Sequence, residues 1–436
     1  MGIYFGTDGF RGIYGEIISP EIAYKVGNSL ARLCNKRKVL IGRDTRQSGS
    51  ILSLSVASGL MSYGINVVDV GIVPTPAVAY LTKKLNFDYG VVISASHNPK
   101  EFNGIKIFDC EGYKISESLE NEIERNLLYS LEKPNEKLGQ YKYCPKLKKH
   151  YKENLLSAAC SLKGLKIALD LANGASYEIG KELFEKLGAK VYATSTGHNG
   201  KKINVDCGAL HPQVISNLVK KYDCDMGFAF DGDADRIIAC DENGKILDGD
   251  DILFLLSQKV PTNQIVGTSM TNKGLEIALS FQGKSLLRAD VGDKYVCSLM
   301  RQSKSLLGGE PSGHIINFLH STTGDGVLTA LTIASIIKEN AKPLSSLLTF
   351  YHYPQCIINI PVVDKYRILN SDLLSSETLK IQHLLSSQGR LLVRASGTEN
   401  KIRVMCEHVE KEKAEKYANT IANIVKEIDN IKKDEL

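Results

Sequence analysis

Residues 226–236 read MGFAFDGDADR, so an apolar strand runs directly into a loop of alternating carboxylates. Two other stretches have the same form, residues 89–97 (YGVVISASH) and residues 306–314 (LLGGEPSGH). Each contains the third strand of a unit that starts with an apolar strand, continues through a helical stretch to a second strand, and ends in a polar loop. The sequence therefore predicts three related α/β domains. Since ligands of open α/β sheets bind beyond the carboxyl ends of the strands, we expect the three loops to converge on one cleft.

The limits of these domains are predicted from changes in composition. A stretch rich in Lys and Tyr, residues 132–150, separates the first two units, and further joints are expected at residues 248–250 and near Tyr353. Apolar residues recur at helical spacing from residue 414 to residue 428, so this last helix is expected to pack on a small sheet of its own. The predicted domains are residues 1–148, 149–249, 250–354 and 355–436.

The composition excludes several classes of protein. The chain has 436 residues, 43% hydrophobic and 24% charged, which is typical of a globular protein and not of a disordered or fibrous one. A net charge of +5 is too small to indicate a nucleic-acid partner. Ten cysteines without a CxxC pair indicate neither a zinc site nor a disulfide framework. No secretory signal or membrane span is evident, so we expect a cytoplasmic protein without a membrane partner, and we interpret the terminal KDEL as a chance match.

Ser96 is the first candidate for a chemical role. It lies in residues 94–99 (SASHNP), directly after an apolar strand and beside His97, where a hydroxyl would be exposed as a nucleophile. A turn in which the serine only caps the backbone would have the same sequence. The strand and turn do not match the nucleophile elbow of hydrolases, which argues against acyl transfer.

Asp231, Asp233 and Asp235 are the candidate metal ligands. Three alternate carboxylates at a strand end can face one hard cation and leave positions for a phosphate oxygen, which favours magnesium. A calcium loop of the EF-hand type needs Gly at its sixth position, where this chain has Arg236. The alternative is a solvated acidic turn, although carboxylates this close repel each other unless a cation neutralises them.

The remaining motifs suit hydroxyl and phosphate groups. Residues 309–314 (GEPSGH) offer a carboxylate, a hydroxyl and an imidazole, and residues 394–399 (RASGTE) with Arg403 offer guanidinium, hydroxyl and backbone N–H groups. The glycine-rich residues 6–12 add Arg11. Each motif alone could be an ordinary loop. Together they supply a nucleophile, a metal cage, a sugar site and a phosphate clamp, which predicts phosphoryl transfer on a sugar phosphate.

These motifs, in this order along essentially the whole chain, resemble those of the α-D-phosphohexomutases, and most closely those of the bacterial members that act on glucosamine phosphates. The resemblance implies four domains around a central cleft: three similar α/β domains with mixed sheets and a small α+β C-terminal domain. In chain order, the four domains would carry the phosphoserine, metal-binding, sugar-binding and phosphate-binding loops.

The resemblance also implies a role for each matching residue. Ser96 would carry the phosphoryl group and, with Asp231, Asp233 and Asp235, would hold one Mg²⁺. The residues implied to lie near the transferring phosphate are Arg11, His97, Lys106 and His314, with Lys106 the first candidate for the general base and the two histidines as alternatives. The implied substrate-binding residues are Arg236, Glu310, Ser312, Arg394, Ser396, Gly397, Thr398 and Arg403.

The function implied by the resemblance is that of an isomerase. It would interconvert glucosamine 6-phosphate and glucosamine 1-phosphate through a phosphoserine enzyme and a 1,6-bisphosphate, feeding UDP-N-acetylglucosamine and peptidoglycan synthesis, as a monomer or homodimer. The alternatives are the same reaction on mannose or glucose phosphates, a metal-dependent phosphatase, and a sugar-phosphate-binding regulator without turnover. Three departures bear on the pattern: Ala209-Leu210 for Ser-Thr, Pro311 for Gln, and Asn400 for Pro. By analogy, the first two are expected near the sugar and weaken the choice of substrate.

Overall fold

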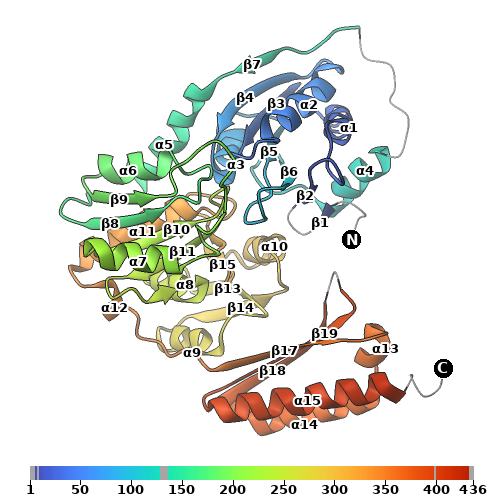
Figure 1. Ribbon diagram of the computed structural model, residues 1–436, viewed down its shortest axis with the longest axis vertical. Coiled ribbons are helices and arrows are strands. Elements are labelled where there is room, and N and C mark those ends of the chain that lie inside the picture. Colours follow the sequence, from blue (N-terminus) through green and yellow to red (C-terminus); the bar gives the residue numbers. More distant parts are fainter. Residues whose placement is uncertain (1–4, 7–8, 128–135, 397–398, 432–436) are drawn as a thin grey trace. The chain divides into compact units, whose positions relative to one another are not determined.

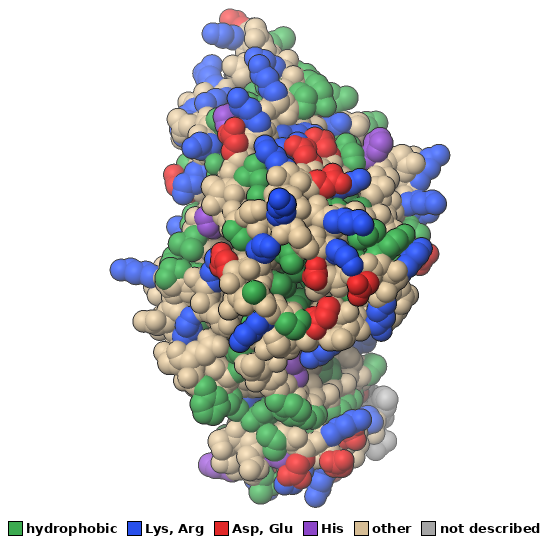
Figure 2. Space-filling model, turned by 90° about the vertical axis from the view of Figure 1, so that its left-hand side faces the viewer, with side chains coloured by type: hydrophobic (Ala, Val, Ile, Leu, Met, Phe, Trp, Pro, Cys, Tyr) green, Lys and Arg blue, Asp and Glu red, His purple; other side chains and the backbone are tan. Residues whose placement is uncertain are grey.

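The computed structural model describes residues 5–6, 9–127, 136–396 and 399–431. The chain divides into two compact units, Met1–Met270 with Lys284–Leu348, and Thr271–Gly283 with Thr349–Leu436. Within the described residues, the first unit contains three sheets and the second contains one (Figure 1). No helix among the described residues combines the length and apolar character needed to cross a bilayer. On the face shown in Figure 2, cationic and acidic side chains are interspersed, in keeping with the small net charge.

The first sheet has the strand order β1-β2-β6-β5-β3-β4-β7. Strands β3, β4 and β5 are parallel, and β6 is antiparallel to β5. Side chains from α1, α2 and α4 share one hydrophobic core with this sheet, while α3 packs on β3 and β5. The elements are β1 (Phe5–Gly6), β2 (Gly9–Ile13), α1 (Pro20–Ala31), β3 (Lys38–Arg43), α2 (Gly49–Met61), β4 (Asn66–Ile72), α3 (Thr75–Lys84), β5 (Tyr89–Ile93), β6 (Phe102–Phe108), α4 (Glu117–Leu127) and β7 (Tyr141–Tyr143).

The second sheet has the order β12-β11-β10-β8-β9, and all five residues of its central strand β10 are buried. Burial on both faces explains why this strand is an uninterrupted apolar run rather than an alternating one. The elements of this part are η1 (Pro145–Leu147), α5 (Lys148–Ser157), β8 (Lys166–Asp170), α6 (Ile179–Lys186), β9 (Lys190–Thr194), α7 (Gln213–Tyr222), β10 (Met226–Phe230), β11 (Ile237–Asp241) and β12 (Ile246–Leu247).

The third sheet has the order β14-β13-β15-β16. Two of its helices begin at side chains that cap them. Asp248 and Asp251 form a capping box at α8, and Asp325 accepts a hydrogen bond from the Leu328 N–H at α11. The elements are α8 (Gly249–Ser257), β13 (Gln264–Thr268), β14 (Ser285–Ala289), α10 (Asp293–Ser303), β15 (Leu307–Gly309), β16 (Ile315–Asn317), α11 (Gly326–Asn340) and α12 (Leu344–Leu347).

The three sheets repeat one arrangement. In each, the first strand of the unit lies between the second and the third, and a fourth strand pairs antiparallel with the third, as β6 does with β5, β11 with β10 and β16 with β15. The predicted internal repeat is therefore confirmed, and so are the mixed sheets. The three polar loops occupy the same position in each sheet, namely the connection between the third and fourth strands.

The second unit contains the small C-terminal α+β domain that the sequence predicts, together with Thr271–Gly283. Its antiparallel sheet has the order β17-β19-β18, and α14 and α15 pack on it through a shared apolar core (Figure 1). Helix α9, although it comes between β13 and β14 in the chain, belongs to this unit. The elements are α9 (Lys273–Phe281), β17 (Gln355–Pro361), α13 (Lys365–Leu369), α14 (Asp372–Leu385), η2 (Ser386–Gln388), β18 (Gly389–Ala395), β19 (Lys401–His408) and α15 (Lys411–Ile431).

Candidate active site

Ser96 lies in contact with the acidic loop of the second domain. Its hydroxyl donates a hydrogen bond to Asp231 Oδ2 at 2.5 Å, and His97 Nδ1 is 3.3 Å from the same hydroxyl oxygen. Ser96 is fully buried and has a φ of +50°, in the left-handed region that non-glycine residues rarely adopt. The fold therefore brings together the predicted nucleophile and the predicted metal loop, which are more than a hundred residues apart in the chain.

The three carboxylates of this loop form one buried cluster. Ligand oxygens of Asp231, Asp233 and Asp235 lie within 4.8 Å of one another, and each residue is at most 1% exposed. Burial, with repulsion from Asp235 and Asp233, raises the pKa of Asp231 well above its ordinary value. Asp233 Oδ1 is buried and has no hydrogen-bond partner among the described residues. Closely spaced carboxylate oxygens, one of which receives no hydrogen bond, suit a small, hard divalent cation such as Mg²⁺.

Two residues of the first domain bind the same cluster. Lys106 Nζ on β6 lies 2.8 Å from Asp233 Oδ2 and 2.7 Å from Asp235 Oδ2. Burial alone would lower the pKa of the Lys106 ammonium, but these carboxylates outweigh burial and raise it. The Thr75 hydroxyl donates to Asp233 Oδ2 at 2.6 Å. Sequence reasoning missed Thr75, because a threonine between two prolines at a helix start reads as a cap.

Positive charge surrounds the Ser96 loop. Arg11 Nη1 donates to Asn98 Oδ1 at 3.0 Å, and Arg236 directly follows the acidic loop. Burial, together with the cations of Arg236 and Arg11, lowers the pKa of His97 to about 4, so its imidazole is neutral at pH 7. Arg236 Nε is buried without a hydrogen-bond partner in the described part of the chain, as expected for a donor that takes up a ligand oxygen.

A cavity of about 310 Å³ adjoins this region and brings together three predicted substrate-binding residues and His314, which is predicted to lie near the transferring phosphate. Arg236, Glu310, Ser312 and His314 line it. Glu310 Oε1 accepts a hydrogen bond from the Gly292 N–H at 2.9 Å, which fixes the direction of its carboxylate. His314 connects the cavity to the acidic cluster, because its Nδ1 lies 3.8 Å from Asp235 Oδ1.

Two of the departures from the family pattern, Pro311 and Ala209-Leu210, are expected near the sugar and can be compared with the lining of this cavity. Pro311 lines it, as expected. Ala209 and Leu210 are not among its described lining residues; the Ala209 N–H donates to the Phe230 carbonyl, and Leu210 is exposed. The expected position of this pair near the sugar therefore stays a prediction, whereas Pro311 lies in the lining of the cavity.

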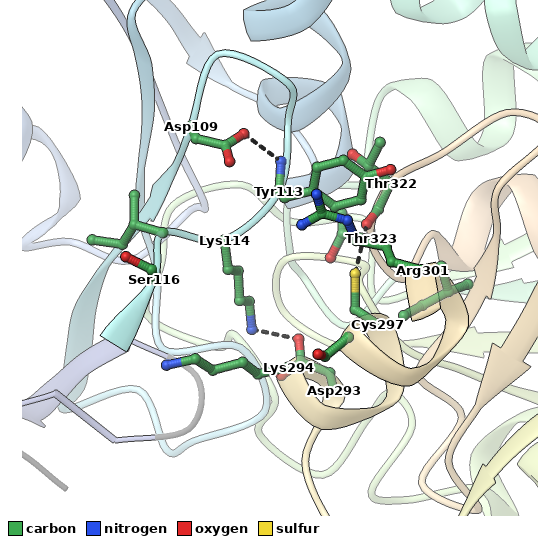
Figure 3. Close-up of a pocket in the computed structure, with 13 residues that line it drawn as sticks. Asp109, Tyr113, Lys114, Ser116, Asp293, Lys294, Cys297, Arg301, Thr322 and Thr323 are labelled. Carbon is green, nitrogen blue, oxygen red and sulfur yellow. Dashed lines mark hydrogen bonds and ion pairs between the residues drawn. The ribbon is translucent and has the colours of Figure 1, made fainter. Parts of the chain in front are cut away.

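A second cavity, of about 230 Å³, lies where the hairpin after β6 meets α10 (Figure 3). Lys114 pairs with Asp293 across it, and the Arg301 guanidinium lies 4.4 Å from the centre of the Tyr113 ring. The Lys114 ammonium outweighs the effect of burial and holds the pKa of Asp293 at about 2. Asp293 also lines the first cavity and is 3.4 Å from His314 Nε2. These contacts join the first and third domains next to the candidate site, and no pattern in the sequence indicates them.

The predicted phosphate clamp lies in the second unit. Arg394 on β18 and Arg403 on β19 are direct cross-strand partners, and the Ser396 N–H donates to the Lys401 carbonyl at 2.8 Å. Like charges directly opposite each other destabilise a sheet, and Glu399 Oε2, 4.0 Å from Arg403 Nη2, supplies one counter-charge. The other two predicted residues, Gly397 and Thr398, lie outside the described residues.

Comparison with known proteins assigns the family. Models of the "phosphoglucomutase/phosphomannomutase" alpha/beta/alpha domains I, II and III match residues 2–132, 142–244 and 248–353, and the model of the family's C-terminal domain matches residues 357–424. The chain belongs to the phosphoglucomutase/phosphomannomutase family. The resemblance to the phosphohexomutases and the four-domain fold are thereby confirmed. The protein is an isomerase, as predicted.

Relatives cover the whole length of this phosphohexomutase. Phosphoglucosamine mutase of Alkaliphilus metalliredigens is 42% identical over 445 residues, covering 98% of this chain and 99% of the relative. A phosphoglucomutase/phosphomannomutase family protein of Burkholderia thailandensis has the same fold, with a TM-score of 0.83, 23% identity and 97% of each chain covered. N-acetylphosphoglucosamine mutase of Aspergillus fumigatus, solved with GlcNAc-6P and magnesium, has a TM-score of 0.68 and 18% identity over 98% of this chain and 96% of its own.

Proposed function

We propose that this phosphohexomutase is a phosphoglucosamine mutase, which interconverts glucosamine 6-phosphate and glucosamine 1-phosphate. The observation that carries the chemistry is the buried Ser96 hydroxyl, held 2.5 Å from Asp231 at the acidic cluster. The substrate follows from the relatives, since the Alkaliphilus metalliredigens protein, 42% identical over nearly the full length, is a phosphoglucosamine mutase. The product would feed UDP-N-acetylglucosamine and peptidoglycan precursor synthesis.

The proposed reaction starts from phosphorylated Ser96. The sugar 1-hydroxyl attacks the phosphorus, the bond from phosphorus to the serine oxygen breaks, and the hydroxyl proton passes to a general base. The product of this half-reaction is glucosamine 1,6-bisphosphate. After the bisphosphate reorients in the site, the Ser96 oxygen attacks the phosphorus of the 6-phosphate and the bond from this phosphorus to the sugar 6-oxygen breaks. The 6-oxygen takes up the proton held by the general base, and glucosamine 1-phosphate is released.

The acidic cluster is proposed to hold one Mg²⁺ through Asp231, Asp233, Asp235 and Ser96 or its phosphate. A bound Mg²⁺ neutralises the charge on the transferring phosphoryl group. The general base is proposed to be Lys106, with His97 and His314 as alternatives. Lys106 donates to two of the carboxylates as an ammonium, so it could accept a proton only once a bound cation has taken over these carboxylates. The neutral His97 imidazole lies 3.3 Å from the serine oxygen. Arg11, beside Asn98, is proposed to contact the transferring phosphate.

The remaining predicted residues are proposed to bind the sugar phosphate. Glu310 and Ser312 would bind sugar hydroxyls, and the unsatisfied Arg236 Nε would take a substrate oxygen. The cross-strand arginines Arg394 and Arg403, with Ser396, Gly397 and Thr398, would hold the phosphate distal to the reaction. We further propose that the protein acts in the cytoplasm, as a monomer or homodimer, with domains at residues 1–148, 149–249, 250–354 and 355–436.

The second candidate is the same reaction on mannose or glucose phosphates. It is favoured by Pro311, which lines the sugar cavity in place of the usual residue. The deciding experiment compares glucosamine, glucose and mannose 6-phosphates in coupled assays with purified enzyme and magnesium. We expect kcat/KM to be highest for glucosamine 6-phosphate. A clear preference for glucose or mannose would overturn the substrate assignment, and release of inorganic phosphate in place of isomerisation would show a phosphatase.

A further inference from the structure

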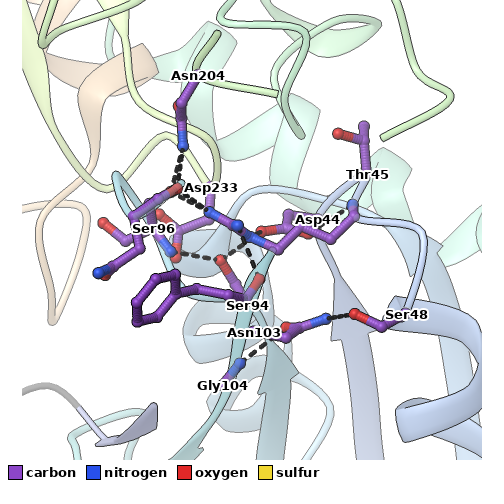
Figure 4. Close-up of polar contacts among 12 residues, drawn as sticks. Asp44, Thr45, Ser48, Ser94, Ser96, Asn103, Gly104, Asn204 and Asp233 are labelled. Carbon is purple, nitrogen blue, oxygen red and sulfur yellow. Dashed lines mark hydrogen bonds and ion pairs between the residues drawn. The ribbon is translucent and has the colours of Figure 1, made fainter. Parts of the chain in front are cut away.

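The strained backbone of Ser96 is held by a buried polar network that reaches into two domains (Figure 4). We propose that Arg46 and Asn204 are positioning residues for the phosphoryl transfer, because together they fix the peptide groups that aim the Ser96 hydroxyl at the acidic cluster. The inference rests on the proposed function in one respect only, which is that Ser96 is the residue that carries the phosphoryl group.

Arg46 binds the Ser96 loop with its whole guanidinium. Nη2 donates to the carbonyls of Ser96 at 2.9 Å and Asn98 at 2.7 Å. Nη1 donates to the carbonyls of Phe102 at 2.8 Å and Pro99. Nε donates to Asp44 Oδ2 at 2.9 Å, so all five N–H groups of the side chain are used. With Arg46 only 2% exposed, water cannot replace these bonds, and a lysine offers too few donors in the wrong geometry.

The N–H of Ser96 is held through Ser94 by Asp44, the carboxylate that also binds Arg46. It donates to Ser94 Oγ at 2.9 Å, and the Ser94 hydroxyl donates to Asp44 Oδ2 at 2.7 Å (Figure 4). The carbonyl of Ser96 is held by Arg46 and its N–H is held through Asp44, so both peptide groups around its Cα are immobilised. A left-handed conformation is unfavourable at a non-glycine residue, and this network offsets that cost.

Asn204 holds the loop from the second domain. Its Nδ2 donates to the Ser96 carbonyl at 2.8 Å and to the Asn98 carbonyl at 3.1 Å, which are the two oxygens that Arg46 Nη2 also binds. The second domain carries the acidic cluster as well. The contact therefore fixes the position of the nucleophile relative to the carboxylates, and errors of about 1 Å in such positions cost about 100-fold in rate.

The test compares Arg46→Lys, Asn204→Ala and the double variant with wild-type enzyme. Two quantities are measured: kcat and KM for glucosamine 6-phosphate, and the rate at which glucose 1,6-bisphosphate phosphorylates Ser96, followed by intact-protein mass spectrometry. We expect kcat and the phosphorylation rate to fall about 10- to 100-fold in each single variant, with KM changed less than about 3-fold, because neither residue lines the sugar cavity.

The double variant tests whether the two residues act on the same carbonyls. If they do, its loss in kcat will be smaller than the product of the two single losses, because one change already frees the loop. If the loss of kcat in the double variant equals the product of the two single losses, the proposal that both residues act on the same carbonyls is overturned. The matched control is Arg43→Lys, which changes a nearby arginine that pairs with Asp69, and we expect it to keep kcat within about 2-fold.

The outcomes separate this inference from the proposed function. If wild-type enzyme turns over and is phosphorylated at Ser96, but folded Arg46→Lys and Asn204→Ala match it, the inference fails alone. A loss confined to KM also overturns it. If wild-type Ser96 accepts no phosphoryl group, the proposed function fails and the inference fails with it. Thermal melting of each variant shows that the compared proteins are folded.

Discussion

The acidic cluster after β10 and the arginine pair on β18 and β19 are charged centres built in opposite ways. Asp231, Asp233 and Asp235 are at most 1% exposed, and the protein itself supplies a counter-cation, Lys106, within hydrogen-bond distance. Arg394 and Arg403 are opposed across a small sheet, and the Arg403 side chain is 40% exposed. The first centre is enclosed and contacted from several loops, whereas both arginines of the second are half-buried and so partly open to solvent.

This difference matches the ligand that each centre suits. A small cation that remains through many turnovers can be enclosed, and the desolvated carboxylates bind it strongly for that reason. A sugar phosphate must enter and leave in each cycle, so an open guanidinium pair suits it better than a buried one. We therefore expect changes at the enclosed centre to affect kcat and metal binding, and changes at the open centre to affect KM.

The largest effect is expected for Ser96→Ala, which removes the nucleophile from the enclosed centre. Without the hydroxyl no phosphoenzyme forms, so kcat should fall by at least about 10⁴-fold while the melting temperature changes little. The matched control is Ser335→Ala, which removes an equally buried hydroxyl that donates to the Leu331 carbonyl of its own helix. Normal turnover of Ser96→Ala in the coupled assay would contradict the mechanism.

The next effect separates metal binding from stability within the same cluster. Asp231→Asn keeps the size of the side chain but cannot ionise, so it avoids the repulsion that an ionised Asp231 meets from Asp233 and Asp235. We expect the metal-free protein to melt about 1–2 °C higher at a pH at which wild-type Asp231 is ionised. Because a ligand charge is lost, affinity for Mn²⁺, measured by electron paramagnetic resonance, should fall at least about 10-fold. Asp241→Asn, at the other end of β11, is the control and should leave Mn²⁺ affinity unchanged. Equal Mn²⁺ affinity in Asp231→Asn would remove Asp231 from the ligand set.

The open centre should respond differently. Arg403→Ala removes one guanidinium of the cross-strand pair, and a charge-assisted hydrogen bond to phosphate contributes about 1.5–3 kcal/mol. We expect KM for the sugar phosphate to rise about 10- to 100-fold in steady-state assays, with a smaller change in kcat. Lys413→Ala, which removes an exposed cation paired with Glu410, is the control. If the loss appears in kcat and not in KM, the distinction between the two centres is wrong.

The sequence predicted the site residues that stand in loops directly after strands. It did not predict the residues that act through long-range contacts to the backbone. The three polar loops were predicted because each follows a strand, and Ser96, Asp231 and Glu310 stand in those loops. Arg46 was missed because Asp44-Thr45-Arg46 reads as an ordinary local ion pair, although its guanidinium binds carbonyls about 50 residues away. No pattern around Asn204 indicates a contact with the nucleophile, and only the fold shows that it binds the Ser96 carbonyl.

The smallest effect concerns a buried carboxylate that stands alone. Burial raises the pKa of Asp325, which accepts hydrogen bonds from the Leu328 N–H and the Tyr151 hydroxyl, to about 6. The unfolded value is about 3.9, so the stability contributed by the protonated form is fully present below about pH 4 and is lost as pH rises through 6. That loss is about 2–3 kcal/mol. Asp325→Asn cannot ionise, so it should avoid the loss.

Calorimetric melting at pH 4.5 and pH 7.5 measures this effect. We expect the melting temperature of Asp325→Asn, relative to wild type, to rise by about 2–4 °C between the two pH values, with activity at neutral pH unchanged. Asp372→Asn, at the exposed start of α14, controls for the removal of a carboxylate at a helix start. If the melting temperatures of wild type and Asp325→Asn change with pH in the same way, ionisation of the buried carboxylate does not destabilise the fold. In that case burial alone would not explain why the carboxylates of the acidic cluster need a cation.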